Sequence, residues 1–157
     1  VLNLTHIERK PLREILLPWK DVNSVRSTDP MDEVVPVVFA SGHTRLPVTG
    51  EDGRVTGVLH TKEFLAYRES GGRDWPSIVR PILRVLSTDT ALPALRLMQE
   101  RRSHMAAVHS PAGELLGIVT LEDISEEIWG DIFDEDEDSR IRKVFADRMK
   151  RRKPPAR

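Results

Sequence analysis

Residues 117–123, GIVTLED, form an apolar run that ends in Thr120 and is followed three residues later by Asp123. A Thr at the N-cap of a helix with an acid at the third helical position is a capping box, in which each side chain binds a backbone N–H of the other residue. The segment therefore predicts a strand that passes directly into a helix. It also leaves two readings open: the hydroxyl and the carboxylate serve only as a cap, or they also hold a ligand.

The same pattern occurs 60 positions earlier, as GVLHTKE at residues 57–63. This offset also aligns VRSTD (25–29) with VLSTD (85–89), and Gly53 with Gly113, without a gap. The matching residues lie at turns and caps, and the apolar pattern agrees between them, which indicates an internal duplication.

Each copy predicts a strand, a helix that starts at the Thr-Asp pair, a hairpin with a Gly-containing turn, and a closing helix. Because a unit of about 60 residues buries too little surface to be stable alone, the two β-α-β-β-α copies should pack face to face about a pseudo-twofold axis. We therefore expect an α/β (α+β) fold with repeats at 12–70 and 75–131, and an acidic linker and basic tail at 132–157. Pro36 predicts a kinked or short helix in the first copy.

Composition limits the classes of function. The chain has 157 residues, of which 39% are apolar and 31% charged, with a net charge of −1 and no cysteine. Disulfides, thiolate metal sites and a cysteine nucleophile are therefore excluded, and no overall field favours polyanions. The longest apolar run, VVPVVFA, is too short for a bilayer, which requires about 20 residues. Because the chain opens on Val1 and shows no signal segment, we expect a piece of a longer protein.

The duplication gives the Thr120 segment a place in the fold. If its strand ends between the repeats, the free N–H groups and the positive end of the following helix point into a cleft. A phosphate could then bind near Thr120, and the Asp123 carboxylate could accept hydrogen bonds from two ribose hydroxyls. The first copy has His60 and Glu63 at these positions, so we expect one competent cleft and one that is weakened or empty.

Several motifs resemble those of a known family. The segments SGHTRLPV (41–48), GVLHTKEFL (57–65), RRSHMAAV (101–108) and GIVTLEDISEEIWGDIFDEDED (117–138) are similar to the CBS-domain pair, or Bateman module, of the CorC/cyclin M (HlyC-like) magnesium and cobalt transport and efflux family. The segment ILLPWKDV (15–22) resembles the family's first strand, although Leu16, Trp19 and Lys20 depart from its pattern. The likeness covers roughly residues 12–138.

The resemblance implies a regulatory module that is not an enzyme and that binds ATP, or another adenine nucleotide, together with Mg²⁺. It also implies a homodimer formed through the CBS helices, at the cytoplasmic side of the cell membrane. The module would serve a transmembrane transport domain that is absent from this chain. It implies no catalytic residues and no metal ligands from the protein. The implied nucleotide site consists of Thr120 and Arg45 on phosphate, Asp123 on ribose, Thr44 and Leu46 along the same cleft, and Leu16 and Pro18 beside adenine.

The remaining features allow plainer interpretations. The acidic residues of 131–138 lack the plan of a calcium loop and predict a solvated linker, with weak Mg²⁺ sensing as the alternative. The tail RMKRRKPPAR (148–157) has no interleaved aromatic residues, so a nucleic-acid partner is not expected. The alternatives to a nucleotide sensor are a purely structural dimerisation module and, through the tail, nucleic-acid binding. On the final helix, four apolar residues predict burial against a second copy: Leu121, Ile124, Ile128 and Trp129.

Overall fold

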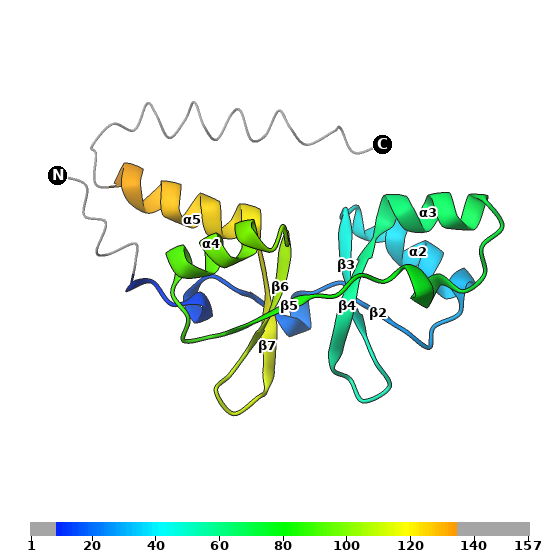
Figure 1. The fold of residues 1–157 in the computed structure, drawn as a ribbon, viewed down its shortest axis with the longest axis horizontal. Helices are drawn as coiled ribbons and strands as arrows, with labels where there is room; N and C mark the ends of the chain where they lie inside the picture. Colours follow the sequence, from blue (N-terminus) through cyan, green and yellow to red (C-terminus); the bar gives the residue numbers. More distant parts are fainter. Residues whose placement is uncertain (1–8, 135–157) are drawn as a thin grey trace.

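The computed structural model describes residues 9–134 and has two similar halves, with the sheets in the middle and the helices at the two ends (Figure 1). None of the helices in this range is long and apolar enough to cross a membrane. The elements are η1 (Leu12–Glu14), β1 (Leu17–Pro18), η2 (Trp19–Asp21), β2 (Val25–Arg26), α2 (Met31–Ser41), β3 (Arg45–Thr49), β4 (Val55–His60), α3 (Thr61–Glu69), η3 (Trp75–Ile78), β5 (Leu83–Leu86), α4 (Ala91–Glu100), β6 (Met105–His109), β7 (Leu115–Thr120) and α5 (Leu121–Asp134).

The two sheets repeat the same pairing. In the first sheet the order is β2-β3-β4, and in the second it is β1-β7-β6-β5. Strands β2 and β5 run parallel to β3 and β6, which then form antiparallel hairpins with β4 and β7. Arg45 pairs with His60 and Met105 pairs with Thr120, so the hairpin registers agree at the offset of 60. The predicted mixed fold and the duplication are confirmed.

The Thr-Asp pairs close turns ahead of the helices and do not start them. The carboxylate of Asp29 accepts the backbone N–H of Arg26 at 2.9 Å, and that of Asp89 accepts the N–H of Leu86 at 2.8 Å. Helices α2 and α4 begin two residues after each Asp. The sequence correctly locates the turn, but the predicted helix starts are early.

Helix α2 continues past Pro36 to Ser41. Pro36 is exposed and lacks the N–H that would complete an intrahelical hydrogen bond. Val34 and Val38, one turn apart, are both buried in the core of this half. The helix is therefore not shortened, because the buried face holds it on both sides of the proline; the alternative of a kink at Pro36 stays a prediction.

Each half has its own hydrophobic core, and helices cover one face of each sheet. The buried residues of the first core are Val25, Val34, Val38, Leu46, Val48, Leu59, Phe64 and Trp75. Those of the second core are Leu12, Val85, Ala91, Ala94, Met98, Ala106, Val108, Val119 and Ile124.

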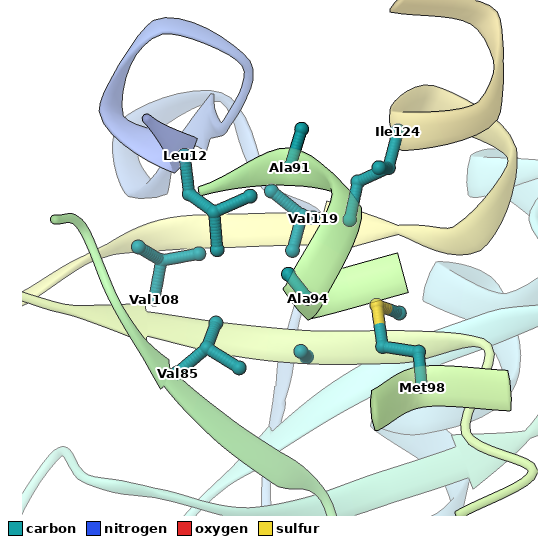
Figure 2. Close-up of a cluster of buried hydrophobic side chains, with 9 residues drawn as sticks. Leu12, Val85, Ala91, Ala94, Met98, Val108, Val119 and Ile124 are labelled. Carbon is teal, nitrogen blue, oxygen red and sulfur yellow. The ribbon is translucent and has the colours of Figure 1, made fainter. Parts of the chain in front are cut away.

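The N-terminal segment completes the second core, although the sequence assigns it to the first repeat. Leu12 is fully buried there and points toward Val119 in Figure 2. Its N–H donates to the carbonyl of Asp89 at 2.8 Å, and the N–H of Arg13 donates to the carbonyl of Ser87 at 3.1 Å. The segment is therefore fixed on the second half before the chain enters the first.

The linker between the repeats does the reverse and completes the first core. Trp75 in η3 is buried against Phe64, with the ring centroids 6.3 Å apart and the planes nearly perpendicular. Its indole N–H donates to the carbonyl of Asp29 at 2.8 Å. The two halves thus exchange connecting segments.

Candidate functional site

A cleft of about 350 Å³, named here the first cleft, opens between the two halves. The starts of β3 and β6, the end of β7 and the first turn of α5 form its walls. It brings Thr44 and Arg45 of the first repeat together with Thr120 and Asp123 of the second. Its lining residues are Leu17, Val22, Asn23, His43, Thr44, Arg45, Pro47, His104, Met105, Ile118, Thr120, Glu122 and Asp123.

Thr120 and Asp123 form one half of the predicted capping box. The Thr120 Oγ1 accepts the backbone N–H of Asp123 at 3.1 Å. Within residues 9–134, the Asp123 carboxylate forms no hydrogen bond or ion pair. Asp123 is half-buried and lines the cleft, so its carboxylate oxygens remain available to a ligand. The reciprocal bond of a capping box is not made.

The first repeat supplies the opposite wall through the start of β3. The N–H of Thr61 donates to the carbonyl of Thr44 at 2.9 Å, and the Thr61 hydroxyl donates to the same carbonyl at 3.1 Å. These bonds fix the chain just before Arg45, whose half-buried side chain lines the cleft. Arg45 therefore brings a permanent positive charge to a wall that faces Thr120 and Asp123.

Three of the predicted site residues lie elsewhere. Leu46 is fully buried in the first core, and Leu16 packs against the second core. Pro18 pairs along the edge of the second sheet but does not line the cleft. Leu17, 41% exposed, lines it instead of Leu16. Because neighbouring side chains of a strand point to opposite faces, Arg45 faces the cleft while Leu46, beside it, faces the first core.

Several lining residues are not among the predicted nucleotide-site residues, and His104 is the most informative of them. Its Nδ1 lies 3.9 Å from a carboxylate oxygen of Glu122. It occupies the position that corresponds to Thr44 at the offset of 60, so the duplication could have identified it. Val22 ends the segment that resembles the family's first strand, and Asn23 follows it directly, which was the signal for these two residues.

A second cleft, of about 260 Å³, lies beside the first and shares Arg45, His104 and Met105 with it. It is the counterpart of the first cleft, because His60 occupies the position of Thr120, and Met105 that of Arg45. Its lining residues are Arg45, Val58, His60, Arg80, Pro81, Arg102, Ser103, His104 and Met105.

The polar groups of the second cleft differ from those of the first. Glu63, at the position of Asp123, forms an ion pair with Arg80. The Nδ1 of His60 is buried without a hydrogen-bond partner in the described part of the chain, and His60 makes no cap to α3. Burial lowers the pKa of His60; Glu63 opposes the shift, and Arg45 and Arg80 add to it. The imidazole is therefore held neutral at pH 7, between cationic side chains.

The apolar face of α5 is used within the chain, contrary to expectation. Ile124 is fully buried in the second core, and Leu121 and Ile128 pack against that core. Trp129 is 57% exposed. Ile124 is therefore covered within the chain, which corrects its prediction as a contact of a second copy. Leu121 and Ile128 are only partly buried, so burial of their exposed part against a second copy stays a prediction, as it does for Trp129.

Among the described side chains, residues 9–130, no group of three or more His, Cys, Asp or Glu residues is able to hold a metal. The predicted acidic cluster falls at the end of α5 and beyond: residues 135–138 and the side chains of 131–134 lie outside the described part. The basic tail lies outside it as well.

The fold and the clefts define a class of protein: a module of two α/β repeats with ligand-accessible clefts between them. A family model described as the CBS domain matches residues 12–70 and 75–130. The structure of the CBS domain of the bacterial CNNM/CorC family Mg²⁺ transporter in complex with ATP is 30% identical, with a TM-score of 0.74, over 81% of this chain and 92% of that chain. The chain belongs to the CBS-domain family, as a CBS pair of the CNNM/CorC type.

Curated relatives agree with this assignment. The magnesium and cobalt efflux protein CorC of Pasteurella multocida is 32% identical over 139 residues, which is 85% of this chain and 46% of the relative. The UPF0053 protein YrkA of Bacillus subtilis is 31% identical over 154 residues, 92% of this chain and 36% of the relative. The chain thus spans less than half the length of these relatives.

Proposed function

We propose that the chain is a regulatory module that binds an adenine nucleotide, ATP with Mg²⁺, in the first cleft. The observation that carries the proposal is the Asp123 carboxylate, which lines the cleft beside Thr120 and has no partner within residues 9–134. A half-buried carboxylate without a partner is costly, and a ligand with two vicinal hydroxyls can satisfy it. A neighbour of the same family has been solved in complex with ATP, which supports the choice of nucleotide.

The contacts follow from the positions of the charges. Asp123 would repel phosphates and suits the ribose, whereas Arg45 and the cap at Thr120 suit the phosphates. Leu17 and Ile118, which pair across β1 and β7, offer the apolar wall for the base. Leu16, Leu46 and Pro18 are left out of the side-chain contacts. The Mg²⁺ would arrive on the phosphates, because no protein cluster among the side chains of residues 9–130 supplies its ligands.

The proposed role is regulatory and not catalytic. A nucleotide that touches both repeats favours one arrangement of the two halves, and a linked transport domain can respond to that arrangement. On this proposal the module lies at the cytoplasmic side of the cell membrane, next to a transmembrane domain, and works as a homodimer. Sedimentation velocity with and without ATP tests the dimer.

The site is tested by calorimetric titration of ATP, Mg-ATP and 2′-deoxy-ATP against the wild type and Asp123→Ala. Loss of hydrogen bonds to a charged group costs about 1.5–3 kcal/mol, so affinity should fall roughly tenfold to over a hundredfold. The matched control is Glu63→Ala, which removes the equivalent acid of the other repeat and should leave the affinity for ATP nearly unchanged.

The deoxynucleotide makes the assignment specific. If Asp123 holds the ribose, the wild type should discriminate against 2′-deoxy-ATP, and Asp123→Ala should bind both nucleotides equally. Unchanged ATP affinity in the variant would remove Asp123 from the site. If the wild type binds no adenine nucleotide at all, the alternative of a purely structural dimerisation module is favoured.

A further inference from the structure

The second cleft concentrates positive charge. Arg45, Arg80 and Arg102 line it together with two histidines, and no Asp or Glu is among its lining residues. Two acids adjoin it without lining it: Glu63 forms an ion pair with Arg80, and a carboxylate oxygen of Glu122 lies 3.9 Å from the Nδ1 of His104. Glu63 offsets the charge of Arg80, whereas Arg45 and Arg102 form no ion pair in the described part of the chain, so an anion between the guanidinium groups would lower their mutual repulsion.

The backbone fixes these arginines from three separate segments. Arg45 begins β3. Arg80 is held at the edge of β4: its N–H donates to the carbonyl of Val58 at 3.0 Å, and its carbonyl accepts the N–H of Val58 at 2.8 Å. Arg102 follows α4 with a φ of 51°, a left-handed conformation that is uncommon for a residue other than glycine. This conformation ends the helix: the N–H of Ser103 donates to the carbonyl of Met98 at 2.9 Å, and Gly42, with a φ of 65°, takes the same position in the first repeat. The helix end therefore fixes where the Arg102 side chain leaves the backbone.

The cleft does not repeat the nucleotide site. His60 replaces the hydroxyl of Thr120, and Glu63, in place of Asp123, is bound to Arg80 and cannot accept ribose hydroxyls freely. The cleft is also smaller, at about 260 Å³ against about 350 Å³. The chemistry that remains suits a compact anion without a sugar.

We propose that the second cleft binds the phosphate groups of a small oxyanion, of the size of orthophosphate or pyrophosphate, through Arg45, Arg80 and Arg102. Guanidinium forks match phosphate oxygens bidentately. The neutral His60 ring can add a hydrogen bond, and a bound anion would favour its protonated form. This site goes beyond the proposed nucleotide function and does not depend on it.

The test is a calorimetric titration of pyrophosphate without Mg²⁺, at constant ionic strength, against the wild type, Arg102→Asn and Arg101→Asn. Asn tolerates the left-handed conformation at position 102, so this variant should fold. Arg101 adjoins Arg102, has ordinary backbone angles and does not line the cleft, so it is a charge-matched control. We expect about tenfold weaker binding for Arg102→Asn and at most about a twofold change for Arg101→Asn.

A second variant should change the affinity for pyrophosphate in the opposite direction. Glu63→Gln releases Arg80 from its ion pair, so pyrophosphate should bind several-fold more tightly. The same titrations with ATP separate the sources of the phosphate. If Arg102→Asn weakens the binding of pyrophosphate, the ligand of the second cleft is a free oxyanion. If the variant weakens only the binding of ATP, the ligand is the phosphate tail of a nucleotide. Equal binding by Arg102→Asn and Arg101→Asn with both ligands overturns the proposal, whatever Asp123→Ala shows for ATP.

Discussion

The Oγ1 of Thr120 accepts the backbone N–H of Asp123 at 3.1 Å, whereas the equivalent residues His60 and Glu63 make no such cap. The hydroxyl of Thr120 thus has a structural task even without a ligand. Because the partly buried N–H of Asp123 loses its partner, Thr120→Val should lower the free energy of unfolding by about 0.5–2 kcal/mol. Thr120→Ser keeps the acceptor and should stay close to the wild type. Urea denaturation with an unchanged m-value checks both; equal midpoints for Val and Ser would contradict the cap.

Leu12 should behave as a core residue of the second half, although it lies near the N-terminus. Leu12→Ala removes a fully buried side chain and should lower the free energy of unfolding by about 2–5 kcal/mol. Leu17→Ala, at a 41% exposed position in β1, is the control and should change it much less. Guanidinium denaturation followed by fluorescence measures both. A small effect of Leu12→Ala would show that the N-terminal segment is not part of the folded core.

Gly117 and Gly130 should respond to alanine in opposite directions. A Cβ on Gly117 would lie 2.0 Å from the carbonyl oxygen of Leu17, so β1 must move away from β7, at a cost of about 1–3 kcal/mol. A Cβ on Gly130 meets nothing within 4 Å, and alanine in a helix is favoured by about 0.5–1 kcal/mol. Melting temperatures should therefore fall for Gly117→Ala and rise for Gly130→Ala. A rise in both would mean that β1 adapts without strain.

The stability of the protein should fall in mild acid because of His60. Burial lowers the pKa of this imidazole below its ordinary value of 6.5, so the unfolded chain binds the proton more readily than the folded one. The folded state therefore loses stability as the pH falls below about 6.5, until the lowered pKa of the folded state is passed. Urea denaturation at several pH values should show that the free energy of unfolding depends less steeply on pH in His60→Gln than in the wild type. An identical slope would mean that other groups cause it.

Arg45 should affect both clefts, because it lines the first and the second. Arg45→Ala is expected to weaken the binding of ATP and of pyrophosphate by about tenfold each. Asp123→Ala should affect only ATP, and Arg102→Asn only free pyrophosphate. Calorimetry with the two ligands on the three variants measures this pattern. If Arg45→Ala changes only one ligand, the guanidinium serves a single cleft.

The duplication made much of the architecture predictable. The offset of 60 between GVLHTKE and GIVTLED matches the strand registers in which Arg45 pairs with His60 and Met105 with Thr120. It also located the turns closed by Asp29 and Asp89 and the cap at Thr120, because these depend on local sequence. Thr120 and Asp123 could be placed between the repeats for the same reason.

The remaining details depend on packing between distant segments. Leu16, just before β1, packs against the second core, and Leu17, the first residue of β1, lines the cleft. The sequence does not reveal which of these two neighbouring side chains faces the core. Arg80 was missed because it lies outside the motifs quoted from the sequence, and Arg102 because it stands where the first repeat has Gly42, so the duplication assigns it no side-chain role. The burial of Leu12 and Trp75 in the opposite halves was missed because adjacency in sequence suggested that each repeat completes itself.

The placement of the N-terminal segment has a mechanical consequence. Lys10 forms an ion pair with Glu127, its carbonyl accepts the N–H of Ala91 at 2.9 Å, and the N–H of Leu12 donates to the carbonyl of Asp89 at 2.8 Å. A pull on the chain ahead of Lys10 therefore loads the second half first, at α5 and at the turn before α4. The tension reaches the first half only after passing through β1 and η2. Thr120 and Asp123 thus lie in the half that receives the force directly.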